Sequence, residues 1–344
     1  METELTVRQR DILRRVVESY VATGQPVGSQ GLVERSGLNV SSSTVRSELA
    51  ELERLGFLTH PHTSAGRVPT ERGYRLYVDG LLERMEPRPG SLPLDLTAAR
   101  SELESAMRAT TEMLSQVTRL LVLVSAPPLE TAIVRHVEVL RLQPQVVMVV
   151  VITSTGGVTK RLLTFGQPVD PGLAKWAGEY LNERVAGLQL GSHLLRQRFG
   201  DQSLSVQELA FLEMVAPTFT DLVEAEEQRL FVGGAAGLLA DVRPDELEAC
   251  RRLLEVLEQR AALLGIMGGV VESRRAFVRM GAELENPALQ NVSLVGASYG
   301  LTNRTLGAVS LLGPVRMDYD MAIRAVRGAA HELSRFVEEV YEEG

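Results

Sequence analysis

A chain of 344 residues with 44% hydrophobic and 23% charged residues is typical of a globular protein of two or three domains. The single cysteine, Cys250, excludes an internal disulfide and any cysteine-rich zinc module, and suits a cytoplasmic protein. The net charge of −8 excludes a protein that is basic over its whole surface. We expect no signal peptide in the charged residues 1–20 and no membrane span, because the longest apolar run, Val146–Ile152, is too short.

The first 86 residues follow the order of a winged helix-turn-helix. Apolar residues at helical spacing, and glycine, serine and proline breaks between them, set the expected boundaries. The expected elements are helices over 6–22, 29–36 and 42–55, strands over 57–59 and 67–68 around the polar loop 60–66, and a fourth helix capped by Thr70. Three helices followed by a two-stranded ribbon are the elements that place a recognition helix and a wing on DNA.

The helix expected over 42–55 has one side suited to a DNA major groove. Serines at 41–43 offer N-cap oxygens, and Gly56 is a natural stop. Valine and leucine gather on one side of the helical wheel, and small, polar and basic residues gather on the other. That outward side consists of Ser43, Arg46, Ser47, Ala50 and Arg54. Small residues let a backbone approach DNA, while hydroxyl and guanidinium groups reach phosphates or base edges.

Charge does not single out this region, because residues 1–86 hold 11 arginines and 12 acidic residues. Any affinity for DNA must therefore come from the local placement of arginine. Arg67, flanked by Arg72 and Arg75, could touch phosphate or enter the minor groove. The alternative is an ordinary surface helix with a solvated hairpin behind it.

The rest of the chain predicts an α+β domain beyond a proline-rich linker at 87–93. The expected helices lie over 94–124, mostly over 168–231 and 246–264, and over 321–342. The expected strands lie over 133–142, 146–153, 158–165, 276–280, 292–299 and 306–312. Because a helical stretch separates the two groups of strands, they fit one antiparallel sheet that carries an insertion.

No arrangement of residues indicates catalysis or a bound cofactor. His60 and His62 could form half of a metal site, but no further ligand lies near them in sequence. The glycine-rich stretch 231–237 lacks dinucleotide-binding spacing, and Cys250 has no histidine nearby. Without a nucleophile and base or a pair of carboxylates at useful spacing, we expect no enzyme, no cofactor and no metal.

Two stretches of the sequence resemble the HrcA family of bacterial heat-inducible transcription repressors. One runs from Ser41 to Asp79 and contains Pro-His-Thr-Ser-Ala-Gly-Arg at 61–67. The other comprises Ser-Leu-Val at 293–295, Tyr299, and Gly-Pro-Val-Arg-Met-Asp-Tyr at 313–319. The resemblance implies an N-terminal winged helix, a GAF-like domain and a dimerising domain inserted into the GAF-like sheet. The expected limits are 1–86 for the winged helix, 87–93 for the linker, 94–167 and 246–344 for the GAF-like domain, and 168–245 for the insertion.

The resemblance also implies a function and its partners. The protein would be a dimeric negative regulator of chaperone operons that binds double-stranded DNA at an inverted repeat called CIRCE. The chaperonin GroEL would keep it active until unfolded proteins draw the chaperonin away. Residues that match the motif carry the expected DNA contacts, and the outward side of the helix adds Arg54. The expected DNA-binding residues are Ser42, Ser43, Thr44, Arg46, Ser47, Arg54, His62, Ser64 and Arg67.

Two alternatives of other classes stay open. A ligand-responsive winged-helix regulator would hold a small molecule in a pocket of the GAF-like domain, although no polar cluster in the sequence points to one. An enzyme built on the α+β domain would use the N-terminal region as a DNA tether, although the sequence lacks a catalytic constellation.

Overall fold

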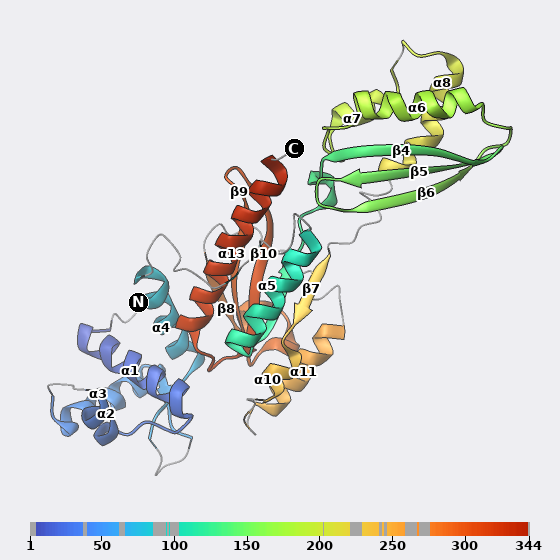
Figure 1. The fold of residues 1–344 in the computed structure, drawn as a ribbon. Helices are drawn as coiled ribbons and strands as arrows, with labels where there is room; N and C mark the ends of the chain where they lie inside the picture. The colour runs from blue at the N-terminus through green and yellow to red at the C-terminus, as the bar shows by residue number, and fades with distance from the viewer. Residues whose placement is uncertain are drawn as a thin grey trace.

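The computed structural model describes residues 5–36, 40–61, 66–84, 94, 96, 103–201, 203–220, 229–240, 243, 246–258, 267 and 276–342. The expected linker at 87–93 lies outside these residues. The described chain is of the α+β class, with helices packed against antiparallel sheets (Figure 1).

The N-terminal elements confirm the predicted order. They are α1 (Val7–Thr23), α2 (Ser29–Ser36), α3 (Ser42–Arg54), the antiparallel pair β1 (Leu58–Thr59) and β2 (Val68–Pro69), and α4 (Glu71–Arg84). Helix α1 starts at a capping box of Thr6 and Gln9 and ends at Gly24, whose φ of 64° is the left-handed conformation that glycine adopts without strain. Buried residues of α1 and α3 form the centre of this unit, which we call the reading unit (residues 5–84).

A five-stranded antiparallel sheet forms the middle of the molecule, with strand order β7-β3-β10-β9-β8. Its strands are β3 (Leu121–Ser125), β7 (Leu230–Gly233), β8 (Phe277–Met280), β9 (Val292–Leu301) and β10 (Arg304–Pro314). Its helices are α5 (Leu103–Thr118), α10 (Ala235–Ala240), α11 (Leu247–Glu258) and α13 (Tyr319–Glu342), with 3-10 turns at Gly281–Leu284 and Pro287–Leu289. Helices α5 and α13 lie side by side on the sheet (Figure 1).

The expectation of one helix over 94–124 is wrong at its C-terminal end. The helix ends at Thr118, Arg119 adopts a φ of 55°, and Leu121–Ser125 forms strand β3. All five residues of this strand are buried, because β3 lies between β7 and β10 and both faces are covered. A continuous apolar run of this kind has the same composition in a buried strand as in a buried helix, so periodicity could not separate the two.

The expectation of a single sheet is also wrong. Strands β4 (Val134–Gln143), β5 (Val146–Thr153) and β6 (Val158–Thr164) form their own three-stranded antiparallel sheet. The 3-10 turn Leu129–Thr131 precedes this sheet in the chain. The helices α6 (Pro171–Arg184), α7 (His193–Arg198) and α8 (Val206–Val215) follow it and lie over one of its faces (Figure 1). Alternate residues of β5, namely Val147, Val149 and Val151, are fully buried in a hydrophobic cluster that these helices share.

Two separate cores therefore underlie the two sheets. One cluster joins the buried residues of α1, α3 and α4 to α5, β3, the C-terminal strands and α13, and the other contains residues between 132 and 219. The second core lies in sequence between β3 and β7 of the five-stranded sheet, so we name the stretch from Leu129 to Phe219 the inserted unit; the expected insertion, 168–245, remains a prediction. The limits implied by the family resemblance placed the three strands in the GAF-like segment 94–167. The short turns between these strands predicted antiparallel pairing, but turns do not reveal which helices will cover a sheet.

Candidate nucleic-acid interface

Helix α3 presents the side that its sequence predicted. Val45, Leu49 and Leu52 are buried against the other helices of the reading unit. The opposite side is open to solvent and consists of Ser43, Arg46, Ser47, Ala50 and Arg54. A helix side of hydroxyl, methyl and guanidinium groups can enter a major groove without steric obstruction.

Hydroxyl groups cluster at the first turn of α3. The Ser41 hydroxyl accepts a hydrogen bond from the Thr44 amide at 3.2 Å, and it lies 2.8 Å from the hydroxyl of Ser43 and 2.9 Å from that of Thr44. Ser42 instead donates to Ser29 of α2 at 3.2 Å. Free amides at a helix N-terminus and neighbouring hydroxyls are groups that bind phosphate oxygens. Ser43 and Thr44 thus present hydroxyl groups at this turn, whereas Ser42 links α2 to α3.

The two arginines on the outward side differ in their surroundings. Arg46 is exposed and forms no ion pair with any residue that the structure describes. Arg54 donates two hydrogen bonds to Glu51, at 2.5 and 2.8 Å, which lowers the pKa of that carboxyl below its ordinary value. Arg46 can bind DNA without giving up a protein partner, and Arg54 cannot.

The ribbon after α3 is fixed to the helix by charge. Arg67 Nε lies 2.9 Å from a carboxylate oxygen of Glu53, and His60 Nδ1 contacts the other oxygen of the same group. The backbone of Arg67 also exchanges hydrogen bonds with Val27, at 2.8 and 2.9 Å. Only 19% of the Arg67 side chain is exposed, so it faces α3 rather than solvent. His62 and Ser64 lie outside the described residues.

The two arginines that flank this ribbon also turn toward the protein. Arg72 lies over the ring of Phe57, with its guanidinium carbon 4.5 Å from the ring centroid, and it donates to the Leu55 carbonyl at 2.9 Å. Arg75 donates to the Val278 carbonyl of β8 at 2.7 Å. Both guanidinium groups are therefore engaged within the protein.

We predict that Arg67 and Glu53 are energetically coupled. Removing either group from this half-buried pair leaves the other without its main partner, so a double-mutant cycle of Arg67→Met and Glu53→Gln should give about 1 kcal/mol of coupling in the free energy of unfolding. Urea unfolding of the four proteins measures it. If the changes in the free energy of unfolding of the two single variants simply add up in the double variant, Arg67 is not coupled to Glu53, and its side chain would then be available to contact phosphate.

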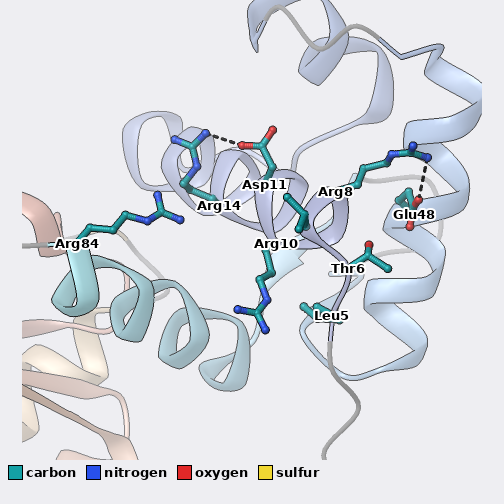
Figure 2. A pocket seen from close by; sticks show the side chains of 9 residues that line it. Leu5, Thr6, Arg8, Arg10, Asp11, Arg14, Glu48 and Arg84 are labelled. Carbon is teal, nitrogen blue, oxygen red and sulfur yellow. Dashed lines mark hydrogen bonds and ion pairs between the residues drawn. The ribbon is translucent and has the colours of Figure 1, made fainter.

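A groove between α1 and α4 adds arginines that the sequence analysis did not select. Its volume is about 1090 Å³, and Arg8, Arg10, Arg14 and Arg84 line it together with Asp11 and Glu48. Figure 2 shows Arg10 and Arg84 extending toward the space between the two helices, while Arg14 pairs with Asp11 at 2.6 Å and Arg8 with Glu48 of α3 at 3.7 Å. The sequence did show three arginines, Arg8, Arg10 and Arg14, within the first helix. Only the fold shows that their side chains line a groove beside α4.

Other chemistry finds little support in the described part of the chain. No group of three or more histidine, cysteine, aspartate or glutamate side chains there could hold a metal ion. Cys250 is buried, and burial raises the pKa of its thiol, so it is a poor nucleophile. No helix among the described residues is both long and apolar enough to cross a membrane.

Comparison with known proteins identifies the family. A family model described as the HrcA protein C-terminal domain matches residues 104–323. A heat-inducible transcription repressor HrcA of Nocardioides is 37% identical over 347 residues, which cover 96% of this chain and 98% of that protein. The repressor of the same name from Frankia casuarinae is 35% identical, with coverage of 94% and 96%. The chain belongs to the HrcA family.

This membership confirms the resemblance predicted from residues 41–79 and 293–319, and it makes the chain a member of a family of transcription repressors. The HrcA family model matches both the five-stranded sheet and the inserted unit, whereas α1–α4 precede it. The crystal structure of a hypothetical protein has the same fold, with a TM-score of 0.63 and 24% identity over 98% of each chain.

Proposed function

We propose that this HrcA-family chain represses heat-shock chaperone operons by binding an inverted-repeat operator, the CIRCE element, as a dimer. In this proposal α1–α4 with β1 and β2 form a winged helix-turn-helix, and the unit built on the five-stranded sheet is GAF-like. The observation that carries the proposal is the exposed side of α3, where Ser43, Arg46 and Ser47 face solvent while the valine and leucines behind them are buried. A single α3 reads only a few base pairs, so tight binding needs two copies on a repeat.

The inserted unit offers a surface for the second copy. Its helices cover one face of the three-stranded sheet, and the other face carries exposed apolar side chains beside the charged residues Glu138 and Lys160. On that face Leu140 lies opposite Met148, which lies opposite Leu162, and Ile152 lies opposite Val158. Val158 is 65% exposed and Leu162 63%. Because exposed apolar patches of adjacent residues mark interaction sites, and a palindromic operator requires twofold symmetry, we propose that two copies pair through this face.

The chaperonin GroEL completes the proposal. The family resemblance implies that GroEL keeps the repressor active, which requires both proteins in the cytoplasm. A gel shift with purified protein and a labelled inverted repeat, with and without chaperonin, tests the whole scheme. We expect one retarded complex that chaperonin increases and that a duplex with one scrambled half-site does not form. Equal affinity for the repeat and the scrambled duplex would contradict sequence-specific repression.

A ligand-responsive regulator is the second candidate, since a cavity of about 380 Å³ lies beside α5, β7 and the turn at Thr155–Gly157. Its charged lining groups already face one another: Arg108 donates to Glu104 at 2.7 Å, and Arg229 lies 3.9 Å from the same carboxylate. A small molecule would have to replace these pairs. An increase in melting temperature with a panel of small anions would support this candidate.

A further inference from the structure

The reading unit contacts the edge of the five-stranded sheet through Arg75 of α4. Its guanidinium donates to the Val278 carbonyl at 2.7 Å and to Glu283 at 3.2 Å, and within α4 it pairs with Asp79 at 2.6 Å. Val278 belongs to β8, an edge strand that pairs only with β9 among the described strands. A side chain of α4 thus satisfies a backbone group that a further strand would otherwise take.

Arg243 makes a second contact with the reading unit, at the C-terminal end of α1. Its guanidinium lies directly against Gly24, the residue that ends α1, and a Cβ at that glycine would lie 1.4 Å from Arg243 Nη1. The last turn of a helix carries partial negative charge, so a cation is favourable there. The backbone amide of Arg243 donates to Glu246 at 3.2 Å, and Glu246 pairs with Arg316, at the end of β10, at 2.8 Å. Arg243 is therefore connected to the sheet on one side and to α1 on the other.

Buried aromatic contact lies between these two points. The rings of Tyr74 and Tyr319 are 6.0 Å apart, and the Tyr319 hydroxyl is 2.8 Å from that of Ser293. Glu71 of α4 lies so close to Gly281 that a Cβ there would come within 2.6 Å of its carboxylate. Together with Arg75 and Arg243, these contacts restrict both sliding and rotation of the reading unit on the sheet.

We propose that Arg75 and Arg243 are positioning residues that hold the reading unit in one orientation and so set the half-site spacing that a dimer accepts. This inference rests on the proposed function. A reading unit held rigidly presents α3 at a fixed distance from the dimer axis, and only a repeat of matching spacing engages both copies. A unit released from the sheet samples many positions, so its effective concentration at any one half-site falls while its tolerance of other spacings rises.

The test compares two operators and three proteins. The operators are the natural inverted repeat and the same repeat lengthened by about 5 base pairs, half a helical turn. The proteins are the wild type, the double variant Arg75→Met with Arg243→Ala, and the control Arg324→Met. Arg324 pairs with Asp320 of its own helix α13 at 3.0 Å, four residues away, as Arg75 pairs with Asp79.

We expect the lengthened repeat to bind the wild type and the control at least about 100-fold more weakly than the natural repeat does. For the double variant, the difference in affinity between the two repeats should be less than about fivefold. The affinity of the double variant for a single half-site should equal that of the wild type. The inference is overturned if the double variant, folded by circular dichroism, discriminates between the spacings as the wild type does.

A measurement without DNA separates this inference from the proposed function. Small-angle X-ray scattering should give a larger radius of gyration for the double variant than for the wild type and the control. Arg75→Lys, which keeps the charge but lacks the forked donor, should lie between them. If the wild type binds no inverted repeat, the proposed function fails. If the radius of gyration of the double variant equals that of the wild type, Arg75 and Arg243 do not hold the reading unit against the sheet, whatever the DNA experiments show.

Discussion

Replacing Arg46 with alanine should weaken binding at each half-site by about 1–3 kcal/mol, which is the discrimination that a bidentate arginine contact to a base supplies. Arg46 lies on the exposed side of α3, between the hydroxyl cluster of the first turn and Ala50. It has no acidic partner among the described residues, so its guanidinium reaches DNA without breaking an ion pair. The loss should be larger on the inverted repeat than on a scrambled duplex, and fluorescence anisotropy at fixed salt measures both.

Arg54→Ala is the matched control for this prediction. Arg54 lies on the same side of the same helix, but it donates two hydrogen bonds to Glu51. Its binding to DNA would have to replace those bonds, so its removal should cost less than the removal of Arg46. Equal losses for the two variants would indicate a general effect of positive charge. Unchanged affinity of Arg46→Ala would remove this arginine from the reading surface.

The position of α3 was predictable because every signal for it is local. An N-cap serine, a buried stripe at 45, 49 and 52, and Gly56 after the last turn all lie within sixteen residues of sequence. The ion pair of Arg54 with Glu51 was also within reach, since residues three apart on a helix are neighbours. Sequence reasoning therefore placed the exposed side of α3 correctly, but it did not weigh how acids on the same helix pair with its arginines.

Contacts between distant segments could not be predicted in the same way. Strand β3 lies between β7 and β10, which come more than a hundred residues later in the chain. Only these partners make the apolar run Leu121–Ser125 a central strand rather than the end of α5. The ion pair of Arg67 with Glu53 and the contact of Arg75 with Val278 likewise depend on how a ribbon and a helix pack. A sequence pattern describes a single helix or strand, whereas each of these contacts joins two elements that are brought together only by the fold.

The division into two cores could not be predicted for the same reason. Strand β5 alternates buried and half-buried residues, as strands with one covered face do. Such alternation predicts that one face of the sheet is covered. It does not predict which helices cover that face or what contacts the other face. The structure assigns α6–α8 to the covered face, and leaves Leu140, Met148 and Leu162 in a row across the open one.

If two copies pair through this face as proposed, replacing Leu162 with aspartate should convert the dimer to a monomer and abolish tight binding to the inverted repeat. Leu162 is 63% exposed in the single chain, so the substitution should hardly change the stability of the fold. In a twofold interface the same substitution places two unpaired carboxylates against apolar partners, which strongly destabilises association. Loss of the second half-site should reduce operator affinity by about 10²–10⁴-fold and leave half-site affinity unchanged.

Val206→Asp provides the control for this variant. Val206 is 84% exposed, yet it lies in the first turn of α8, outside the open face of the sheet. A carboxylate is favourable at a helix N-terminus, so this variant should fold, remain a dimer and bind the operator normally. Light scattering of both variants at equal concentration measures their mass. A Leu162→Asp protein that still has the mass of two chains would show that the open face of β4–β6 is not the surface through which the copies pair.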